Sequence, residues 1–164
     1  MSFELNVLVL DQEQPTYLDD YDFIVEIANE RDNEEIFRRN GWDYMNQQSG
    51  IWYNLGIEED GGFWALRMLD ADFDTNYSVL PYWIDDESVT SNLYPLTVVE
   101  RYRRDVERIL ELLLEGSPKR TVYIMSRMQG WDTEIIVGPV SLKRFWELHD
   151  AGKVLFNVCY LIKE

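Results

Sequence analysis

Residues 96–115, LTVVERYRRDVERILELLLE, hold the most regular pattern in the chain. Apolar side chains recur there every three or four residues, which is the spacing of one face of an α-helix. The residues on that face are Val99, Tyr102, Val106, Ile109, Leu110, Leu113 and Leu114. Gly116, Ser117 and Pro118 follow at once, and glycine and proline end helices. We therefore expect one long amphipathic helix that packs its apolar face on a sheet.

Apolar runs on both sides of this helix predict the strands of that sheet. The expected strands are 3–10, 51–57, 63–69, 121–128, 133–137 and 154–162, with a further short one near 79–84. Residues 23–28 fit either a buried strand or the start of a helix. The segment 58–62, between two of the strands, ends in two glycines and predicts a hairpin turn.

Two shorter helices are expected as well. Asn33 is a favourable N-cap for a helix that ends at Asn40-Gly41, and Ser141 caps a second helix that runs through His149. Hairpins outnumber strand-helix-strand crossovers, which favours an antiparallel sheet with helices on one side. The length of 164 residues suits one domain. The predicted fold is thus a single α+β domain over 1–164, a mostly antiparallel sheet with one long and two short helices packed on it.

The negative charge of the chain is concentrated in its amino-terminal part. Residues 1–92 contain 21 acidic and 4 basic side chains, whereas residues 93–164 contain 10 and 11, and the chain has a net charge of −16. A field of this sign repels nucleic-acid phosphates and anionic lipid surfaces, and it steers basic proteins toward the surface. The predicted partner is therefore a basic protein, with no nucleic acid and no membrane. The oligomeric state is left open.

Arginines on the long helix could suggest a nucleic-acid stripe, but acidic residues alternate with them. Arg101, Arg103, Arg104 and Arg108 stand among Glu100, Asp105, Glu107 and Glu111. Spacings such as Glu100 to Arg104 predict a solvated helix face with ion pairs. The start of the chain has no basic signal region, no apolar run is long enough to cross a bilayer, and Cys159 is the only cysteine. These features predict a cytoplasmic protein.

Signals of catalysis and of metal binding are weak. Asp70, Asp72 and Asp74 resemble the opening of a calcium loop, but Thr75 stands where that loop needs glycine and Pro81 where it needs glutamate. His149 is the only histidine, so zinc lacks its usual ligands, and we expect structural roles for His149 and Cys159. The sequence contains no phosphate loop and no serine-elbow motif. We expect no cofactor, no metal and, on balance, no enzyme activity.

Acidic residues stand beside aromatic residues at several points of the chain. Tryptophan and tyrosine dominate protein-binding hot spots, and neighbouring carboxylates pair with basic groups of a partner. The candidate partner-binding residues are Trp42, Asp43, Glu58, Glu59, Asp60, Asp70, Asp72, Asp74, Tyr82, Trp83, Asp85, Asp86 and Glu87. The competing interpretation is that the rings pack the sheet and the acids keep the surface soluble.

In size, acidity and expected compartment the chain resembles small bacterial immunity proteins, which neutralise toxins that are often nucleases. The resemblance implies a non-catalytic inhibitor whose carboxylates occlude the positively charged cleft of a basic protein. Two alternatives stay open. One is a small enzyme or ligand-binding domain with an aromatic-lined pocket, which a deep cavity with convergent polar groups would favour. The other is a phage-type nucleic-acid mimic, which regularly spaced surface carboxylates would favour.

Overall fold

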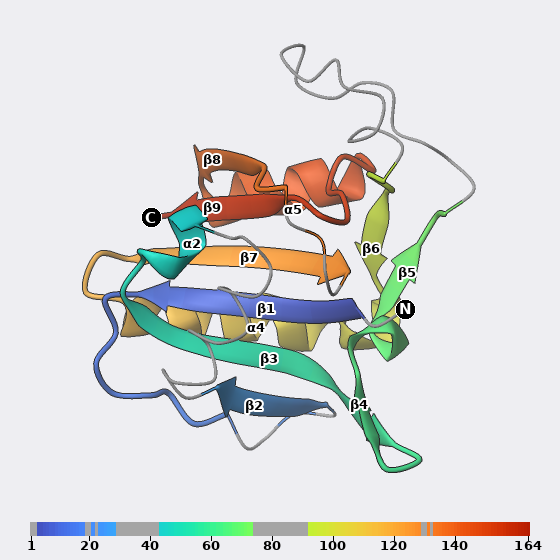
Figure 1. The fold of residues 1–164 in the computed structure, drawn as a ribbon, viewed down its shortest axis with the longest axis horizontal. Helices are drawn as coiled ribbons and strands as arrows, with labels where there is room; N and C mark the ends of the chain where they lie inside the picture. Colours follow the sequence, from blue (N-terminus) through green and yellow to red (C-terminus); the bar gives the residue numbers. More distant parts are fainter. Residues whose placement is uncertain are drawn as a thin grey trace.

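The computed structural model describes residues 3–18, 21, 23–28, 43–73, 92–128, 131 and 133–164 (Figure 1). The side chains of residues 24–28, 43 and 46 are not described. The helix predicted at 33–40 and the strand predicted near 79–84 lie outside the described residues. Among the described residues, no helix is long and apolar enough to cross a membrane.

The main sheet has the strand order β2-β3-β1-β7-β9-β8, and β4 also pairs with β3 (Figure 1). Its strands are β1 (Phe3–Leu10), β2 (Ile24–Ala28), β3 (Gly50–Glu59), β4 (Gly62–Trp64), β7 (Thr121–Met128), β8 (Ile136–Val140) and β9 (Cys159–Lys163). Every pairing in this sheet is antiparallel except that of β8 with β9, which is parallel. The predicted α+β class is confirmed, and the sheet is mixed. Residues 23–28, ambiguous in sequence, form the edge strand β2.

A second, two-stranded sheet corrects the predicted start of the long helix. Strand β6 (Leu96–Val98) pairs with β5 (Leu69–Ala71), and the helix α4 spans Glu100–Gly116. The apolar pattern continues through both elements, so the pattern alone did not separate them. Backbone hydrogen bonds separate the two elements. Leu96 N–H donates to Val154 O at 2.9 Å and Val99 N–H donates to Met68 O at 2.8 Å, and these bonds hold residues 96–98 extended.

The helices α4 and α5 (Leu142–Asp150) cover one face of the main sheet (Figure 1). The predicted face of α4 is confirmed, since Tyr102, Val106, Ile109, Leu110, Leu113 and Leu114 are all buried. These side chains join Leu5, Val7 and Val9 of β1 and Val122 and Ile124 of β7 in one core. The cap predicted for the short helix is also present, because Ser141 Oγ accepts a hydrogen bond from Arg144 N–H.

The opposite face of the sheet carries a second, smaller core. It contains Leu8, Met45, Trp52, Tyr123, Met125 and Cys159. Met45 comes from α2 (Asp43–Asn46), a one-turn helix that the sequence did not predict. The carboxylate of Glu134 accepts hydrogen bonds from the backbone N–H groups of Tyr44 at 3.0 Å and Met45 at 3.2 Å. The expectation that all helices pack on one side is therefore wrong: a long-range carboxylate holds α2 on the other side.

Three predicted strands differ from the structure by three residues or more at one end. The second hairpin strand ends at Trp64 rather than Leu69, because Ala65–Arg67 form a 3-10 turn and the chain then enters β5. The terminal strand begins at Cys159 rather than Val154, since Asn157 has a φ of 63° and its Oδ1 accepts from Met128 N–H. The strand predicted at 133–137 lies at Ile136–Val140.

Candidate binding surface

A tight hairpin presents three of the predicted partner-binding residues. Glu59 pairs with Gly62, so only Asp60 and Gly61 form the turn, with φ values of 52° and 75°. Two successive residues with positive φ define a type I′ turn, whose twist matches the flanking strands, and Asp-Gly is a preferred sequence for it. Glu58, Glu59 and Asp60 are all exposed at this turn. The hairpin thus holds three carboxylates on a short, well-defined element.

The indole of Trp64 lies across the same hairpin. A Cβ atom added to Gly62 would lie 2.8 Å from Trp64 Nε1, so the ring occupies the space that a side chain at position 62 would need. Trp64 Nε1–H donates to the main-chain oxygen of Glu59 at 2.9 Å, and the residue is still 45% exposed. One part of the indole is fixed by the hairpin, and the rest faces solvent beside the carboxylates. Trp64 is not among the site residues predicted from sequence, although Phe63-Trp64 closely follows Glu58-Glu59-Asp60.

One carboxylate of the hairpin has a partner within the chain. Arg67 Nε lies 2.9 Å from Glu59 Oε2, and both side chains are about half exposed, at 58% and 48%. An exposed ion pair of this kind contributes little to stability, about 0–1 kcal/mol. It therefore leaves Glu59 free to exchange Arg67 for a basic group of another protein at low cost.

A second group of acidic residues follows on β5. Asp70 and Asp72 are exposed, and Phe73 next to them is 46% exposed. The Phe73 ring packs on Phe3, Tyr94 and Phe156, with centroids 5.6, 5.3 and 5.7 Å apart. Asp70 lies on β5 and pairs with Thr97, so the segment is extended chain at this point. Like the hairpin, this group combines carboxylates with a partly exposed ring that the fold holds in place.

Both groups lie at the same end of the molecule. The hairpin of β3 and β4 and the strand β5 are at the end where β1 begins and β7 finishes (Figure 1). We call Glu58–Asp60, Trp64, Asp70, Asp72 and Phe73 the acidic end. The opposite end, where β7 begins and β9 finishes, carries Lys119, Arg120 and Lys163 together with Asp11 and Glu164. Exposed Glu13 and Glu115 lie near the opposite end as well, so acidic and basic side chains are mixed there.

The other predicted site residues either fall outside the described residues or belong to another element. Trp42, Asp74, Tyr82, Trp83, Asp85, Asp86 and Glu87 lie outside the described residues. The backbone of Asp43 belongs to α2, which Figure 1 places toward the other end of the sheet. Of the residues chosen from sequence, five lie at the acidic end: Glu58, Glu59, Asp60, Asp70 and Asp72.

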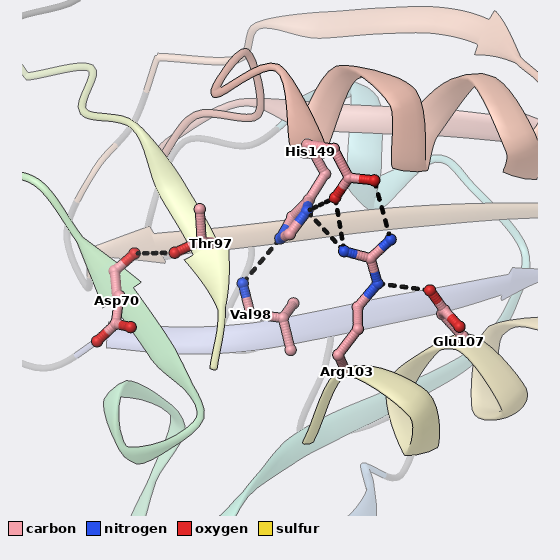
Figure 2. A network of polar contacts seen from close by, with 7 residues as sticks. Asp70, Thr97, Val98, Arg103, Glu107 and His149 are labelled. Atoms are coloured by element: carbon pink, nitrogen blue, oxygen red, sulfur yellow. Dashed lines mark hydrogen bonds and ion pairs between the residues drawn. The ribbon is translucent and has the colours of Figure 1, made fainter. Parts of the chain in front are cut away.

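A polar network on the helical side binds α4 to α5 (Figure 2). The guanidinium of Arg103 bonds to both carboxylate oxygens of Asp150, at 2.6 and 3.3 Å, and its Nε bonds to Glu107 at 2.5 Å. Its Cζ lies 4.0 Å from the centroid of the Trp146 ring, a cation–π geometry. The hydrogen bond from Arg103, followed by that from His149, lowers the pKa of Asp150 to about 2. The helix ion pairs are Arg103–Glu107 and Arg108–Glu111, and not those at the predicted spacings from Arg104.

His149 joins this network to the small sheet. The backbone N–H of Val98 donates to His149 Nε2 at 2.8 Å, so Nε2 carries the lone pair and Nδ1 carries the proton. Nδ1 then donates to Asp150 Oδ1 at 3.0 Å (Figure 2). The 3.1 Å contact between Nδ1 and Arg103 Nη1 is not a hydrogen bond in this tautomer, because both groups are donors. The residue is 5% exposed and its ring packs edge-on against Trp146. Because Nε2 is occupied by Val98, this histidine positions β6 against α5 and presents no basic nitrogen to a substrate.

Cys159 and His149 lie on opposite faces of the main sheet. Cys159 belongs to the core beneath α2, whereas His149 packs on Trp146 in the core beneath α4 and α5. Cys159 is fully buried, and that burial raises the pKa of its thiol. The two side chains therefore do not form a nucleophile–base pair, which requires hydrogen-bond contact and a thiolate.

A small cavity lies between the sheet and the helices. Its volume is about 20 Å³, and most of its lining is apolar, with Ser126, Trp146 and His149 among the lining residues. A volume of this size suits about one water molecule, whereas ligand pockets span about 300–1,000 Å³. The cavity therefore gives no support to the aromatic-pocket alternative.

Among the described residues, no three histidine, cysteine or acidic side chains are grouped so that they could hold a metal ion. In comparisons with known proteins, the chain gives no significant match to a family model, to a curated protein or to a solved structure. We therefore infer the function of the chain from the geometry of the acidic end.

Proposed function

We propose that this chain is a non-catalytic binding protein that occludes a basic protein partner with its acidic end. The observation that carries the proposal is the indole of Trp64, held across Gly62 by its bond to Glu59 O and left 45% exposed beside three exposed carboxylates. Large rigid rings lose little conformational entropy when they bind, and they anchor interfaces. The carboxylates supply charge complementarity around that anchor.

The two features would act at different stages of binding. The field of a chain with a net charge of −16 accelerates encounter with a cationic surface and orients it toward the acidic end. After contact, a partner can cover the exposed rings of Trp64 and Phe73 at the acidic end, and covering them slows dissociation. Glu58, Asp60 and Asp70 would then pair with lysine and arginine side chains.

The finer proposal is an inhibitor of the immunity type, directed at a toxin or a nuclease. An active-site cleft that binds nucleic-acid phosphates is cationic, and a carboxylate-bearing hairpin complements such a cleft in both shape and charge. The type I′ turn supports this reading because it makes the hairpin narrow and rigid, so that it can enter a cleft without ordering a loop.

Affinity capture tests the proposal. The tagged chain should recover a basic protein from an extract of the source organism or, if a toxin gene is adjacent, the product of that gene. The variant Glu58→Lys/Glu59→Lys/Asp60→Lys should no longer recover that basic protein. The matched control is Glu13→Lys/Glu111→Lys/Glu115→Lys, which changes the net charge equally at exposed positions elsewhere. Equal capture by the two variants would argue against the acidic end as the contact surface.

A further inference from the structure

The two edges of the main sheet differ in whether another strand can be added. Strands β2 and β8 end the strand order. On β8, Pro139 has no N–H to donate and the pairing with β9 shifts register between Val137 and Val140, and such features block edge pairing. Strand β2, Ile-Val-Glu-Ile-Ala, pairs with β3 at all five residues without a bulge. It contains no proline and no lysine, the residues that most often protect an edge.

Among the described residues, no strand pairs with the outer side of β2. Backbone N–H and C=O groups of an edge strand alternate between the inner and the outer side, so the outer groups can pair with an added strand. A second copy of this chain is a poor occupant because it would bring together two molecules that each have a net charge of −16. A positively charged segment is the occupant that the charge favours.

The position of the hairpin defines where the positive charge of that segment should lie. Ile24 pairs with Gly56, and Glu58 follows two residues later on β3, so the Ile24 end of β2 is the end nearest the hairpin carboxylates. An added antiparallel strand would run opposite to β2 and would finish beside Ile24. Basic residues that follow the strand would then meet Glu58, Glu59 and Asp60.

We infer that the basic partner adds an extended segment to the outer edge of β2, in antiparallel orientation, with basic residues directly after the strand. This inference rests on the proposed function, since it specifies which kind of segment of the basic partner binds beside the acidic end. Main-chain pairing supplies affinity in this binding mode, and the flanking lysines or arginines supply selectivity.

A synthetic peptide tests this inference without a known partner. The probe is Thr-Val-Thr-Val-Thr-Lys-Lys-Lys, and the controls are Thr-Val-Pro-Val-Thr-Lys-Lys-Lys and the peptide with its lysines moved to the front. Amide hydrogen exchange of residues 24–28 is measured by NMR at saturating peptide. The probe should slow exchange of alternate β2 amides at least tenfold, and the proline peptide should leave it unchanged, because proline breaks the ladder.

Exchange in β2 that is unchanged by the probe would overturn the inference, as would equal protection by the proline peptide. The probe and the proline peptide could still shift the NMR signals of the hairpin and bind the Glu58→Lys/Glu59→Lys/Asp60→Lys variant more weakly than the parent. That result would show that the acidic end binds cations without strand addition. The proposed function would then stand while this inference fails. Equal effects of the probe and the peptide with its lysines at the front would overturn the antiparallel orientation.

Discussion

Trp64 Nε1–H and the main-chain oxygen of Glu59 are joined by a 2.9 Å hydrogen bond across the β3–β4 hairpin. The bond fixes a partly exposed indole next to exposed carboxylates, so that the ring is ordered before any partner arrives. Gly62 makes this possible, because its missing side chain leaves the space that the indole fills. Interfaces gain affinity when their anchors are ordered in advance.

Gly62→Ala should displace the indole and leave the rest of the fold intact. The new Cβ would lie 2.8 Å from Trp64 Nε1, and Gly62 is not among the residues with positive φ, so the backbone tolerates alanine. We expect the indole N–H signal of Trp64 to shift in NMR spectra and the partner to dissociate about tenfold faster. Tyr17→Ala, which removes a ring that is 74% exposed elsewhere, is the control. An unchanged indole signal would show that Gly62 does not position the ring.

Arg103 and Asp150 should be energetically coupled. Their two hydrogen bonds join α4 to α5, and the Arg103 side chain is only 19% exposed, although that of Asp150 is 59% exposed. A double-mutant cycle with Arg103→Met and Asp150→Asn should give a coupling free energy of about 0.5–1 kcal/mol from urea unfolding. Arg103→Lys should retain only part of this coupling free energy with Asp150, since lysine lacks the planar fork that reaches both carboxylate oxygens. Additive effects of the two substitutions would contradict the pairing.

Asp150 should add stability that is lost in acid. Its pKa falls from 3.8 to about 2 in the folded protein, chiefly through the hydrogen bond from Arg103 and then that from His149. A carboxyl with a lowered folded pKa stabilises the fold above its unfolded pKa, and the contribution disappears as the pH falls from about 4 through about 2. The free energy of unfolding of Asp150→Asn should therefore be lower than that of the parent at neutral pH. The free energies of unfolding of Asp150→Asn and the parent should converge near pH 2. A difference between them that stays constant with pH would exclude this linkage.

His149 should be found as the tautomer with its proton on Nδ1. Val98 N–H donates to Nε2, which leaves Nδ1–H to bond Asp150. Since His149 is the only histidine, its two ring nitrogens can be assigned in a ¹⁵N NMR spectrum at about pH 8 without ambiguity. We expect Nε2 to give the unprotonated shift in the folded protein and the usual mixture of tautomers in urea. A protonated Nε2 in the folded protein would disprove the bond to Val98.

Elements whose signal is local were predicted well from the sequence. The buried face of α4, the Ser141 cap of α5 and the strands 3–10 and 121–128 each follow from a short pattern or a single capping residue. The division of 96–115 into β6 and α4 was missed, because Leu96 and Val98 satisfy the helical pattern while their backbone bonds go to residues distant in sequence. Helix α2 was missed for a similar reason: Glu134, some 90 residues away, accepts its first N–H groups.

The candidate surface was predictable only in part. The acids of 58–60 and the glycines after them are visible in the sequence, and they gave both the hairpin and its charge. The role of Trp64 depends on its packing across Gly62, which no single-sequence pattern reveals. The network of Arg103, Asp150 and Trp146 was out of reach because it joins two helices whose relative placement follows from the core.

The most direct test of the acidic end is the salt dependence of its association with the captured basic partner. Association rates are measured by stopped flow between low and high ionic strength for the parent, for Glu58→Lys/Glu59→Lys/Asp60→Lys and for Glu13→Lys/Glu111→Lys/Glu115→Lys. We expect the rate for the parent to fall steeply with salt, the hairpin variant to be slow at every salt concentration, and the control to remain close to the parent. A rate for the parent that is indifferent to salt, or equal losses in the two variants, would contradict the proposal.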